Sequence, residues 1–292
     1  MTDRFVLPDG RHVAVHRLGM PEGRPVVLCH PAPGSGLFDP VPAITERRGA
    51  AIIAVDRPGY GDSDPVGAEA WATVSGAADD LATVLRAAGI EQVGVAGWSA
   101  GGRVAMALAA RHPDLVDRLC VIATPAPNED VAWIPPEHAA ALDAMAGLPP
   151  EQVKAILGEQ LAAMVPSDPF APAALGLIGA DEAADAGALA LDGARERLGG
   201  MLDLAFAQGA AGMVSDLAGY TLRPWGFEPD AVRQKTLLIY GGRDPVIGSR
   251  HGRWWQRHLP DARLEMDPSV GHLAVMSGWD RALAFLGSTR RR

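Results

Sequence analysis

The chain has 292 residues, of which 48 % are hydrophobic and 21 % are charged, the balance expected of a globular protein with a sizeable core. Its formal net charge is −9, with basic residues scattered except for a run at 290–292, which argues against nucleic acid or an anionic membrane as the main partner. The N-terminus shows no signal-peptide pattern and no stretch reaches the ~18 apolar residues of a membrane-spanning helix, so we expect a cytoplasmic protein.

Short apolar runs alternate with longer helical patterns along much of the chain. Residues 4–19 read as two strands joined by a turn at Pro8-Asp9-Gly10. The runs at 25–30 and 50–56 are continuous and β-branched, which is typical of strands buried on both faces. Further strands are expected at 92–97, 118–124, 235–241 and 263–267, and helices at 71–89 and 100–112.

This alternation predicts the α/β class, with a mostly parallel central sheet and helices on both of its faces. Residues 125–230 interrupt the alternation with sequence rich in alanine, leucine and glycine and with no convincing strand. We interpret this segment as a helical cap inserted between two late strands, placed to cover one edge of the sheet as a lid. The expected organisation is a first part of the core at 1–124, the cap at 125–230 and a second part of the core at 231–292.

Ser99 lies between an expected strand and an expected helix, in the sequence Gly97-Trp98-Ser99-Ala100-Gly101. This matches the pattern G-x-S-x-G, in which a sharp strand-to-helix turn exposes the serine, and the residues two before and two after it must be small. The positive end of the following helix favours a negative charge that develops there. The pattern predicts that Ser99 is a nucleophile, with a glycine-rich turn without chemistry as the alternative.

A serine hydroxyl is a weak nucleophile unless a base takes its proton, and that base must itself be oriented. In enzymes with this serine turn the chain order is serine, acid, histidine. Of the eight histidines only His272 lies late enough, on a loop after the last expected strand, and it is the predicted base. Asp244, in the turn after the strand at 235–241, is the predicted acid. Three other aspartates compete less well for that role: Asp130, Asp216 and Asp267.

The tetrahedral intermediate of acyl transfer needs N–H donors for its negatively charged oxygen. One is expected from the backbone of Ala100, the residue after the nucleophile. The second is expected from the loop after the strand at 25–30. There Pro31 and Pro33 have no N–H, and Ala32 between them has one. His30 is expected to orient this loop and to take no part in the chemistry.

Five segments occur in a characteristic order: HPAPGSG (30–36), DRPGYGDSD (56–64), GWSAGG (97–102), YGGRDPVI (240–247) and GHL (271–273). Together they resemble the α/β-hydrolase fold superfamily, in its branch with a serine nucleophile and a helical cap, and in particular a group of bacterial hydrolases. The resemblance covers the sheet portions of the chain and implies a triad of Ser99, Asp244 and His272. It departs from the family pattern at Pro31, where a glycine is usual.

The resemblance implies a serine hydrolase that cleaves a small to medium, uncharged ester through an acyl-enzyme. No metal or organic cofactor is expected, because no cluster of His, Cys or Asp has the spacing of metal ligands. A small-molecule substrate is the expected partner, and the sequence leaves the oligomeric state open. The composition of the cap favours an apolar pocket, although aromatic residues often serve only in packing. The aromatic residues expected at this pocket are Trp98, Tyr220, Trp225 and Phe227.

Other reactions in the same superfamily use the same three residues. An aminopeptidase like proline iminopeptidase would need acidic residues in the cap to hold an amine, and Asp181, Glu182 and Asp185 are available. A carbon–carbon bond hydrolase, a cofactor-free haloperoxidase (perhydrolase) and a hydroxynitrile lyase are not separated from an esterase by sequence. Dehalogenases and epoxide hydrolases are disfavoured, since the resemblance gives them an aspartate at the position of Ser99. A non-catalytic ligand receptor is the alternative from another class, and a complete triad argues against it.

Overall fold

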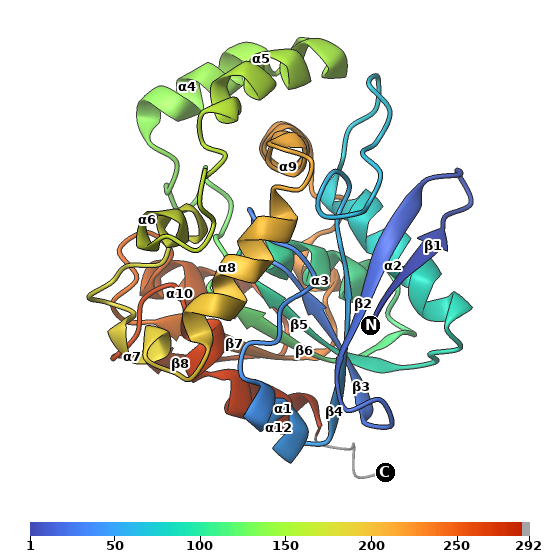
Figure 1. Ribbon diagram of the computed structural model, residues 1–292, viewed down its shortest axis with the longest axis vertical. Coiled ribbons are helices and arrows are strands. Elements are labelled where there is room, and N and C mark those ends of the chain that lie inside the picture. Colours follow the sequence, from blue (N-terminus) through green and yellow to red (C-terminus); the bar gives the residue numbers. More distant parts are fainter. Residues whose placement is uncertain (288–292) are drawn as a thin grey trace.

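Eight strands form one sheet: β1 (Thr2–Val6), β2 (His12–Gly19), β3 (Arg24–Cys29), β4 (Ala50–Val55), β5 (Val93–Trp98), β6 (Val116–Ile122), β7 (Lys235–Gly241) and β8 (Ala262–Asp267). Their order across the sheet is β1-β2-β4-β3-β5-β6-β7-β8 (Figure 1). This computed structural model describes residues 1–287, so the basic run at 290–292 lies outside the described residues. The strands β3 to β8 pair in parallel, whereas β2 runs antiparallel to both β1 and β4. The predicted mostly parallel sheet is therefore confirmed.

The strand boundaries follow the apolar runs to within two residues. β1 and β2 form the expected hairpin, and Gly10 in its turn has a φ of 89°, a conformation that glycine adopts without strain. β6 begins and ends two residues earlier than the predicted 118–124. The cause lies at Ala123, whose φ of 46° takes the chain out of the extended conformation directly after Ile122.

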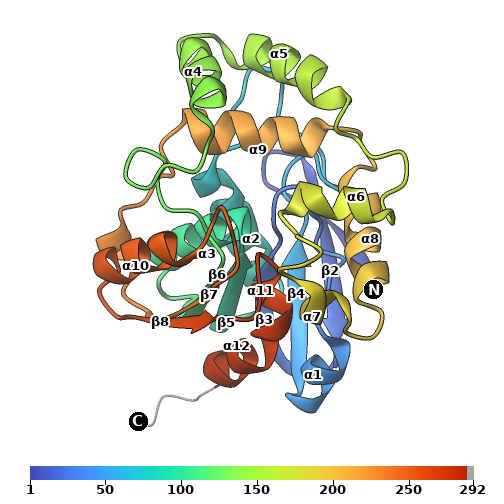
Figure 2. The same cartoon turned by 90° about the vertical axis from the view of Figure 1, so that its left-hand side faces the viewer.

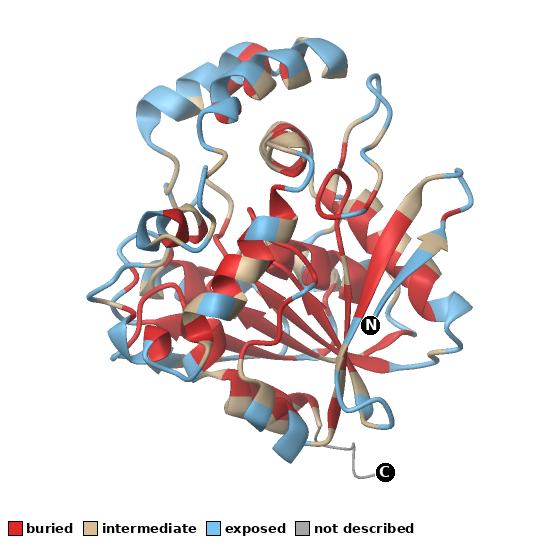
Figure 3. Cartoon of the chain, viewed as in Figure 1, coloured by how far each residue is buried: buried red, intermediate tan, exposed pale blue. Residues whose placement is uncertain are grey.

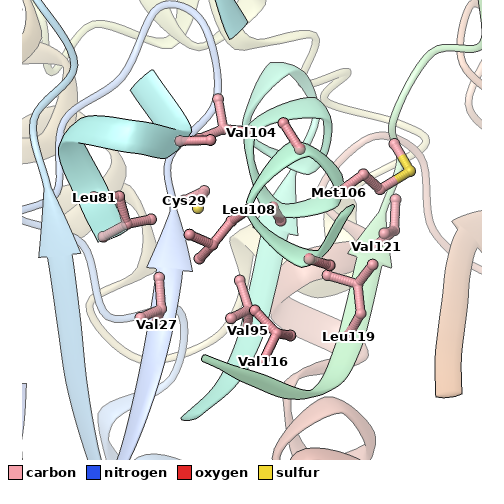
Figure 4. Close-up of a cluster of buried hydrophobic side chains, with 14 of the residues drawn as sticks. Val27, Cys29, Leu81, Val95, Val104, Met106, Leu108, Val116, Leu119 and Val121 are labelled. Atoms are coloured by element: carbon pink, nitrogen blue, oxygen red, sulfur yellow. The ribbon is translucent and has the colours of Figure 1, made fainter. Parts of the chain in front are cut away.

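Helices cover both faces of the sheet. On one face lie α2 (Val74–Ala87), α3 (Ala100–Arg111) and α10 (Ser249–His258), and on the other lie α1 (Pro42–Arg47), α11 (Ala274–Ser277) and α12 (Trp279–Leu286) (Figure 2). α2 begins later than predicted because the Thr73 hydroxyl accepts a hydrogen bond from the N–H of Gly76 at 3.0 Å and caps the helix. Figure 4 shows how Leu81 and Leu108 pack on strand side chains such as Val95. This packing holds α3, which begins directly after Ser99, against the sheet.

Between β6 and β7 the described chain forms helices and no strand. Six α-helices lie there: α4 (Pro136–Met145), α5 (Pro150–Ala162), α6 (Pro172–Leu175), α7 (Ala186–Leu189), α8 (Ala194–Ala205) and α9 (Ala211–Leu222). α4 and α5 lie farthest from the sheet, beyond α9, and Figure 3 shows their outer surfaces largely exposed. They bury a separate small apolar cluster against α9, for which Leu157 and Val214 are typical. The predicted helical insertion between late strands is present.

Candidate active site

Ser99 stands in a strained turn between β5 and α3. Its backbone has a φ of 54° and a ψ of −123°, a combination that non-glycine residues rarely adopt. Two hydrogen bonds hold the strained residue: its N–H donates to the carbonyl oxygen of Ile122 at 2.9 Å, and its own carbonyl accepts from the Thr124 hydroxyl at 2.9 Å. The turn lifts the Ser99 side chain out of the sheet, and the residue stays partly exposed while Trp98 before it is buried.

The glycines around Ser99 are explained by close backbone approach. A Cβ atom on Gly97 would lie 2.5 Å from the carbonyl oxygen of Gly101, closer than real Cβ atoms come. A Cβ on Gly101 would collide with the carbonyl oxygens of Cys29 and His30 at the end of β3. The residues two before and two after the serine are small because α3 starts directly against the sheet, as the motif predicted.

His272 and Asp244 meet on the loops that follow β8 and β7. The Nδ1 atom of His272 donates a hydrogen bond to Oδ2 of Asp244 at 2.6 Å, and both residues are buried. The other oxygen, Oδ1, accepts from the N–H groups of Val246 at 3.0 Å and Ile247 at 2.8 Å. Burial would raise the pKa of Asp244, but the hydrogen bond and charge of His272 together with these N–H groups outweigh it, so the pKa lies below its usual value. Asp244 is therefore an ionised partner for His272 at neutral pH.

A cavity of about 370 Å³ brings the predicted residues together. Ser99, His272 and Asp244 line it, and so do Ala32 and Ala100, the two predicted backbone donors. Ala100 is the first residue of α3, so its N–H has no acceptor within the helix. The remaining walls are mostly apolar and come largely from the segment between β6 and β7, with Leu161, Leu177, Ile178, Met213 and Leu217 among them.

Arg57, just after β4, fixes the loop that carries Ala32. Its guanidinium donates to the carbonyl oxygen of His30 at 2.6 Å and to that of Pro31 at 2.8 Å. The His30 ring adds two bonds: Nδ1 donates to the Pro31 carbonyl at 2.9 Å, and Nε2 accepts from the backbone N–H of Arg57 at 3.2 Å. Burial, and then the charge of Arg57, lower the pKa of His30 well below its usual value, which keeps this ring neutral. The predicted orienting role of His30 agrees with these contacts.

The same arginine ties the loop to α9. Asp216 of α9 accepts from Arg57 through both carboxylate oxygens, at 3.2 and 2.6 Å, and also from the Tyr60 hydroxyl at 3.0 Å. All three side chains are buried. Asp216 also lines the cavity at Ser99, but its oxygens are bonded to Arg57 and Tyr60 and not to His272. The other two competing aspartates lie elsewhere. Asp130 is exposed at a neighbouring cavity, and Asp267 accepts from Ser269.

The aromatic residues expected at the pocket divide into two groups. Tyr220 of α9 lines the cavity at Ser99. The prediction has to be corrected for the other three, which are not among the residues that line this cavity. Trp98 is fully buried beneath it and donates from Nε1 to the carbonyl oxygen of His272 at 3.1 Å. Trp225 and Phe227 instead line a second cavity, of about 1000 Å³, and stack on each other with ring centroids 6.3 Å apart.

Three buried charged residues around the site have roles that the sequence did not predict. Arg57 holds the Ala32 loop, Arg103 of α3 lines both cavities, and Asp185 bonds to the backbone beside His272. Arg57 lies in the segment DRPGYGDSD (56–64), which could have drawn attention to it, whereas the burial that distinguishes all three residues is visible only in the structure. Within residues 1–287, no three His, Cys, Asp or Glu side chains are grouped as metal ligands, and no helix is long and apolar enough to cross a bilayer.

Comparisons with known proteins agree with this architecture. A family model described as alpha/beta hydrolase fold matches residues 24–278, so the chain belongs to the α/β-hydrolase fold family, as its motifs predicted. A pimeloyl-acyl-carrier-protein methyl ester esterase of Neisseria meningitidis is 30 % identical over 231 residues, which are 77 % of each protein. A protein of the same name from Chromobacterium violaceum is 29 % identical over 266 residues, 88 % of this chain and 90 % of that one. A hydrolase from Pseudomonas aeruginosa superimposes over 98 % of both chains with a TM-score of 0.68 and 23 % identity, which shows the shared fold.

Proposed function

We propose that this protein is a serine esterase that cleaves small to medium esters through an acyl-enzyme, and that residues 125–230 form the cap over its active site. Ser99 is the nucleophile, His272 the general base and acid, and Asp244 the residue that orients His272. The observation that carries the proposal is the 2.6 Å bond between His272 and Asp244 beside Ser99 on one apolar cavity. The names of the relatives from Neisseria meningitidis and Chromobacterium violaceum, both methyl ester esterases, support the reaction class.

In the first half of the reaction, the Ser99 hydroxyl attacks the ester carbonyl while Nε2 of His272 takes its proton. Nδ1 of His272 keeps its proton on the side of Asp244, whose negative charge stabilises the imidazolium that forms. The carbonyl oxygen becomes an oxyanion, and the N–H groups of Ala32 and Ala100 are the donors proposed for it. His272 then protonates the leaving alcohol, and the acyl group stays on Ser99.

In the second half, a water molecule takes the place of the alcohol. His272 removes its proton, the resulting hydroxide attacks the acyl-enzyme, and the same two N–H groups bind the second oxyanion. Collapse of this intermediate returns the proton to Ser99 and releases the acid. Each oxyanion donor typically contributes about 2.7–4 kcal/mol to lowering the barrier. The contacts of Arg57 with the Ala32 loop therefore support catalysis by keeping one donor in place.

The aminopeptidase alternative is weakened by where its acidic residues lie. Asp185 is fully buried and bonded to backbone N–H groups, while the Glu182 side chain is exposed and paired with Arg195. Neither residue lines the cavity at Ser99, so neither is placed to hold a substrate amine there. The carbon–carbon hydrolase, perhydrolase and lyase alternatives need the same three residues, and reaction assays separate them from an esterase.

The test is the hydrolysis of p-nitrophenyl esters from acetate to dodecanoate by the wild type and by Ser99→Ala. We expect an optimum at short to medium acyl chains and a loss of at least about 1000-fold in kcat for Ser99→Ala. Ser167→Ala, at an exposed serine between α5 and α6, is the matched control and should keep full activity. A fluorophosphonate should add covalently to Ser99, detected by mass spectrometry of the peptides. Turnover undiminished in Ser99→Ala, or none with any ester, contradicts the proposal.

A further inference from the structure

Arg103 is a buried cation that has no carboxylate within ion-pair distance in the part of the chain that the structure describes, although the charges of Asp216 and Glu129 act on it from farther away. It lies four residues after Ser99 on α3, and only 4 % of it is exposed. Its Nε atom is buried without a hydrogen-bond partner, and Arg103 forms no ion pair with any residue of 1–287. Two indole rings contact the guanidinium, Trp225 at 4.4 Å and Trp133 at 5.4 Å from the ring centroids. Burial lowers the pKa of Arg103 to about 10, so the side chain still carries its charge at neutral pH.

Two further hydrogen-bond donors around Arg103 also lack partners. The hydroxyl of Tyr220 and the indole Nε1 of Trp133 are both buried and unpaired. Arg103, Trp133 and Tyr220 all line the cavity at Ser99, and all three also line the 1000 Å³ cavity beside it. The carbonyl of Tyr220 accepts from Nε1 of Trp225, which keeps that ring against Arg103. Three unused donors therefore gather where the two cavities meet.

A buried charge and buried donors without partners are costly, and proteins keep few of them without a reason. The neighbouring carboxylates do not fill this need. Asp216 is bonded to Arg57 and Tyr60, and Glu129 and Asp130 are exposed, where water screens their charge. A ligand that brings its own anion would satisfy Arg103, Tyr220 and Trp133 together.

We propose that Arg103, Tyr220 and Trp133 bind a carboxylate of the substrate, so that the preferred substrates are esters that carry a second, ionised carboxyl group. This inference rests on the proposed esterase function and replaces the uncharged ester expected from sequence. A carboxylate fits better than a phosphate monoester, because the single charge of Arg103 balances one negative charge, whereas a phosphate monoester carries nearly two.

The spacing on α3 sets the expected size of the substrate. Ser99 and Arg103 are four residues apart, which places them on one side of the helix and about 6 Å apart along its axis. An acyl chain that starts at Ser99 and ends in a carboxylate at Arg103 is therefore short. Half-esters of short dicarboxylic acids, with four to six carbon atoms, are therefore the first substrates to test.

The experiment compares monomethyl glutarate with dimethyl glutarate, which have the same chain and differ in one charge. Release of methanol gives kcat/KM for each ester, and we expect the wild type to prefer the monomethyl ester at least tenfold. Arg103→Met should reduce this ratio at least tenfold, and Arg103→Lys should retain part of it. Arg111→Met is the matched control, because Arg111 lies on the same helix, half-exposed and paired with Asp79, and its ratio should equal that of the wild type. A wild-type ratio near one, or an unchanged ratio in Arg103→Met, overturns the inference.

A binding measurement separates this inference from the proposed esterase function. Titration calorimetry with Ser99→Ala, which does not turn the ligand over, should show monomethyl glutarate binding at least tenfold more tightly than dimethyl glutarate. The preference should disappear in Ser99→Ala/Arg103→Met. Preferential binding without Ser99-dependent hydrolysis of either ester would support the carboxylate site and contradict the esterase. Ser99-dependent hydrolysis of both esters with equal binding would support the esterase and contradict the carboxylate site.

Discussion

Asp185, directly before α7 in the helical insertion, holds the backbone on both sides of His272. One oxygen of its carboxylate accepts from the N–H of Gly271 at 2.9 Å and from the N–H of Leu273 at 3.0 Å, and the other accepts from the N–H of Asp181 at 3.0 Å. Gly179 lies against the same histidine, so closely that a Cβ atom there would be 2.9 Å from Cδ2 of the ring. The loop that presents His272 is therefore held jointly by the sheet and by the helical insertion between β6 and β7.

Asp185→Ala should lower kcat at least tenfold and leave KM nearly unchanged, because it removes no contact with the cavity but releases the His272 loop. Two buried N–H groups would lose their acceptor, so we also expect a loss of roughly 2–4 kcal/mol in the free energy of unfolding. Asp185→Asn keeps one carbonyl oxygen for Gly271 and Leu273 and should recover part of kcat. Steady-state kinetics and urea titration measure the two effects.

The matched control for this variant is Asp192→Ala, at an exposed aspartate in the cap. It should leave kcat unchanged and should change the free energy of unfolding by no more than about 0.5 kcal/mol. If Asp185→Ala loses stability but keeps the kcat of the wild type, Asp185 is a structural residue only and does not position His272. Equal losses in Asp185→Asn and Asp185→Ala would show that the charge, not the geometry, is what matters.

The buried pair of Arg57 and Asp216 couples α9 to the oxyanion loop. Removing one partner leaves the other charged and buried, so Arg57→Met should cost about 3–5 kcal/mol of folding free energy. The double variant Arg57→Met/Asp216→Leu should be more stable than the sum of the single losses predicts, by at least about 2 kcal/mol. A double-mutant cycle by urea denaturation measures this coupling.

The exposed pair of Arg195 and Glu182, also in the cap, is the control for that cycle. Its coupling energy should be below about 1 kcal/mol, because water screens both charges. Both Arg57 variants should also lose kcat, since the carbonyls of His30 and Pro31 lose their donor and Ala32 becomes less fixed. Equal coupling energies for the two pairs would contradict the assigned importance of burial.

The sequence was sufficient to predict which residues meet beside Ser99. Residues that directly follow parallel strands lie at the same edge of a sheet, so Asp244 after β7 and His272 after β8 approach each other once the strand order is right. The strands themselves were predictable because continuous apolar, β-branched runs leave few other conformations that bury them. The roles of these residues in the reaction stay a proposal until Ser99→Ala is measured.

The positions of side chains in the helical insertion could not be predicted in the same way. A side chain at 125–230 is placed by how several helices pack on one another, and nothing in the local sequence determines that packing. Trp225 and Phe227 therefore lie at the second cavity and not beside Ser99. Asp185 was considered from sequence only as an acid that could hold a substrate amine, yet it is fully buried, and the backbone beside His272 supplies its partners.

Ser99→Gly should make the protein more stable while it abolishes turnover. The φ of 54° and ψ of −123° at Ser99 are strained for any residue with a Cβ atom, whereas glycine adopts them readily. We expect a gain of about 1 kcal/mol in the free energy of unfolding, measured by urea titration. Ser99→Ala keeps the Cβ atom and should show no such gain, which makes it the control. If the two variants are equally stable, the turn at Ser99 holds no releasable strain.

The stability of the protein should fall in mild acid because His30 and His251 are buried as neutral rings. His251 accepts from the N–H of Ala126 at 3.1 Å and bonds through Nε2 to the carbonyl of Val246 at 3.0 Å. Burial lowers its pKa to about 4, and burial lowers that of His30 as well. In the unfolded chain both rings take up protons near pH 6.5, whereas in the folded chain His251 does so only near pH 4, so the free energy of unfolding decreases as the pH falls through this interval.

For His251 alone we expect the free energy of unfolding to fall by roughly 2 kcal/mol between pH 7 and pH 4. One pKa unit corresponds to about 1.4 kcal/mol, and the figure is reduced because a protonated ring regains part of its hydration. Urea titrations at pH 7.5, 6.0 and 4.5 measure it. His251→Asn has no ring to protonate and should show a shallower pH dependence, although its stability at pH 7.5 is lower. His138→Asn, at an exposed histidine of α4, should keep the slope of the wild type. If His251→Asn and the wild type lose stability in parallel, the acid sensitivity comes from other groups and His251 is not held neutral by its burial.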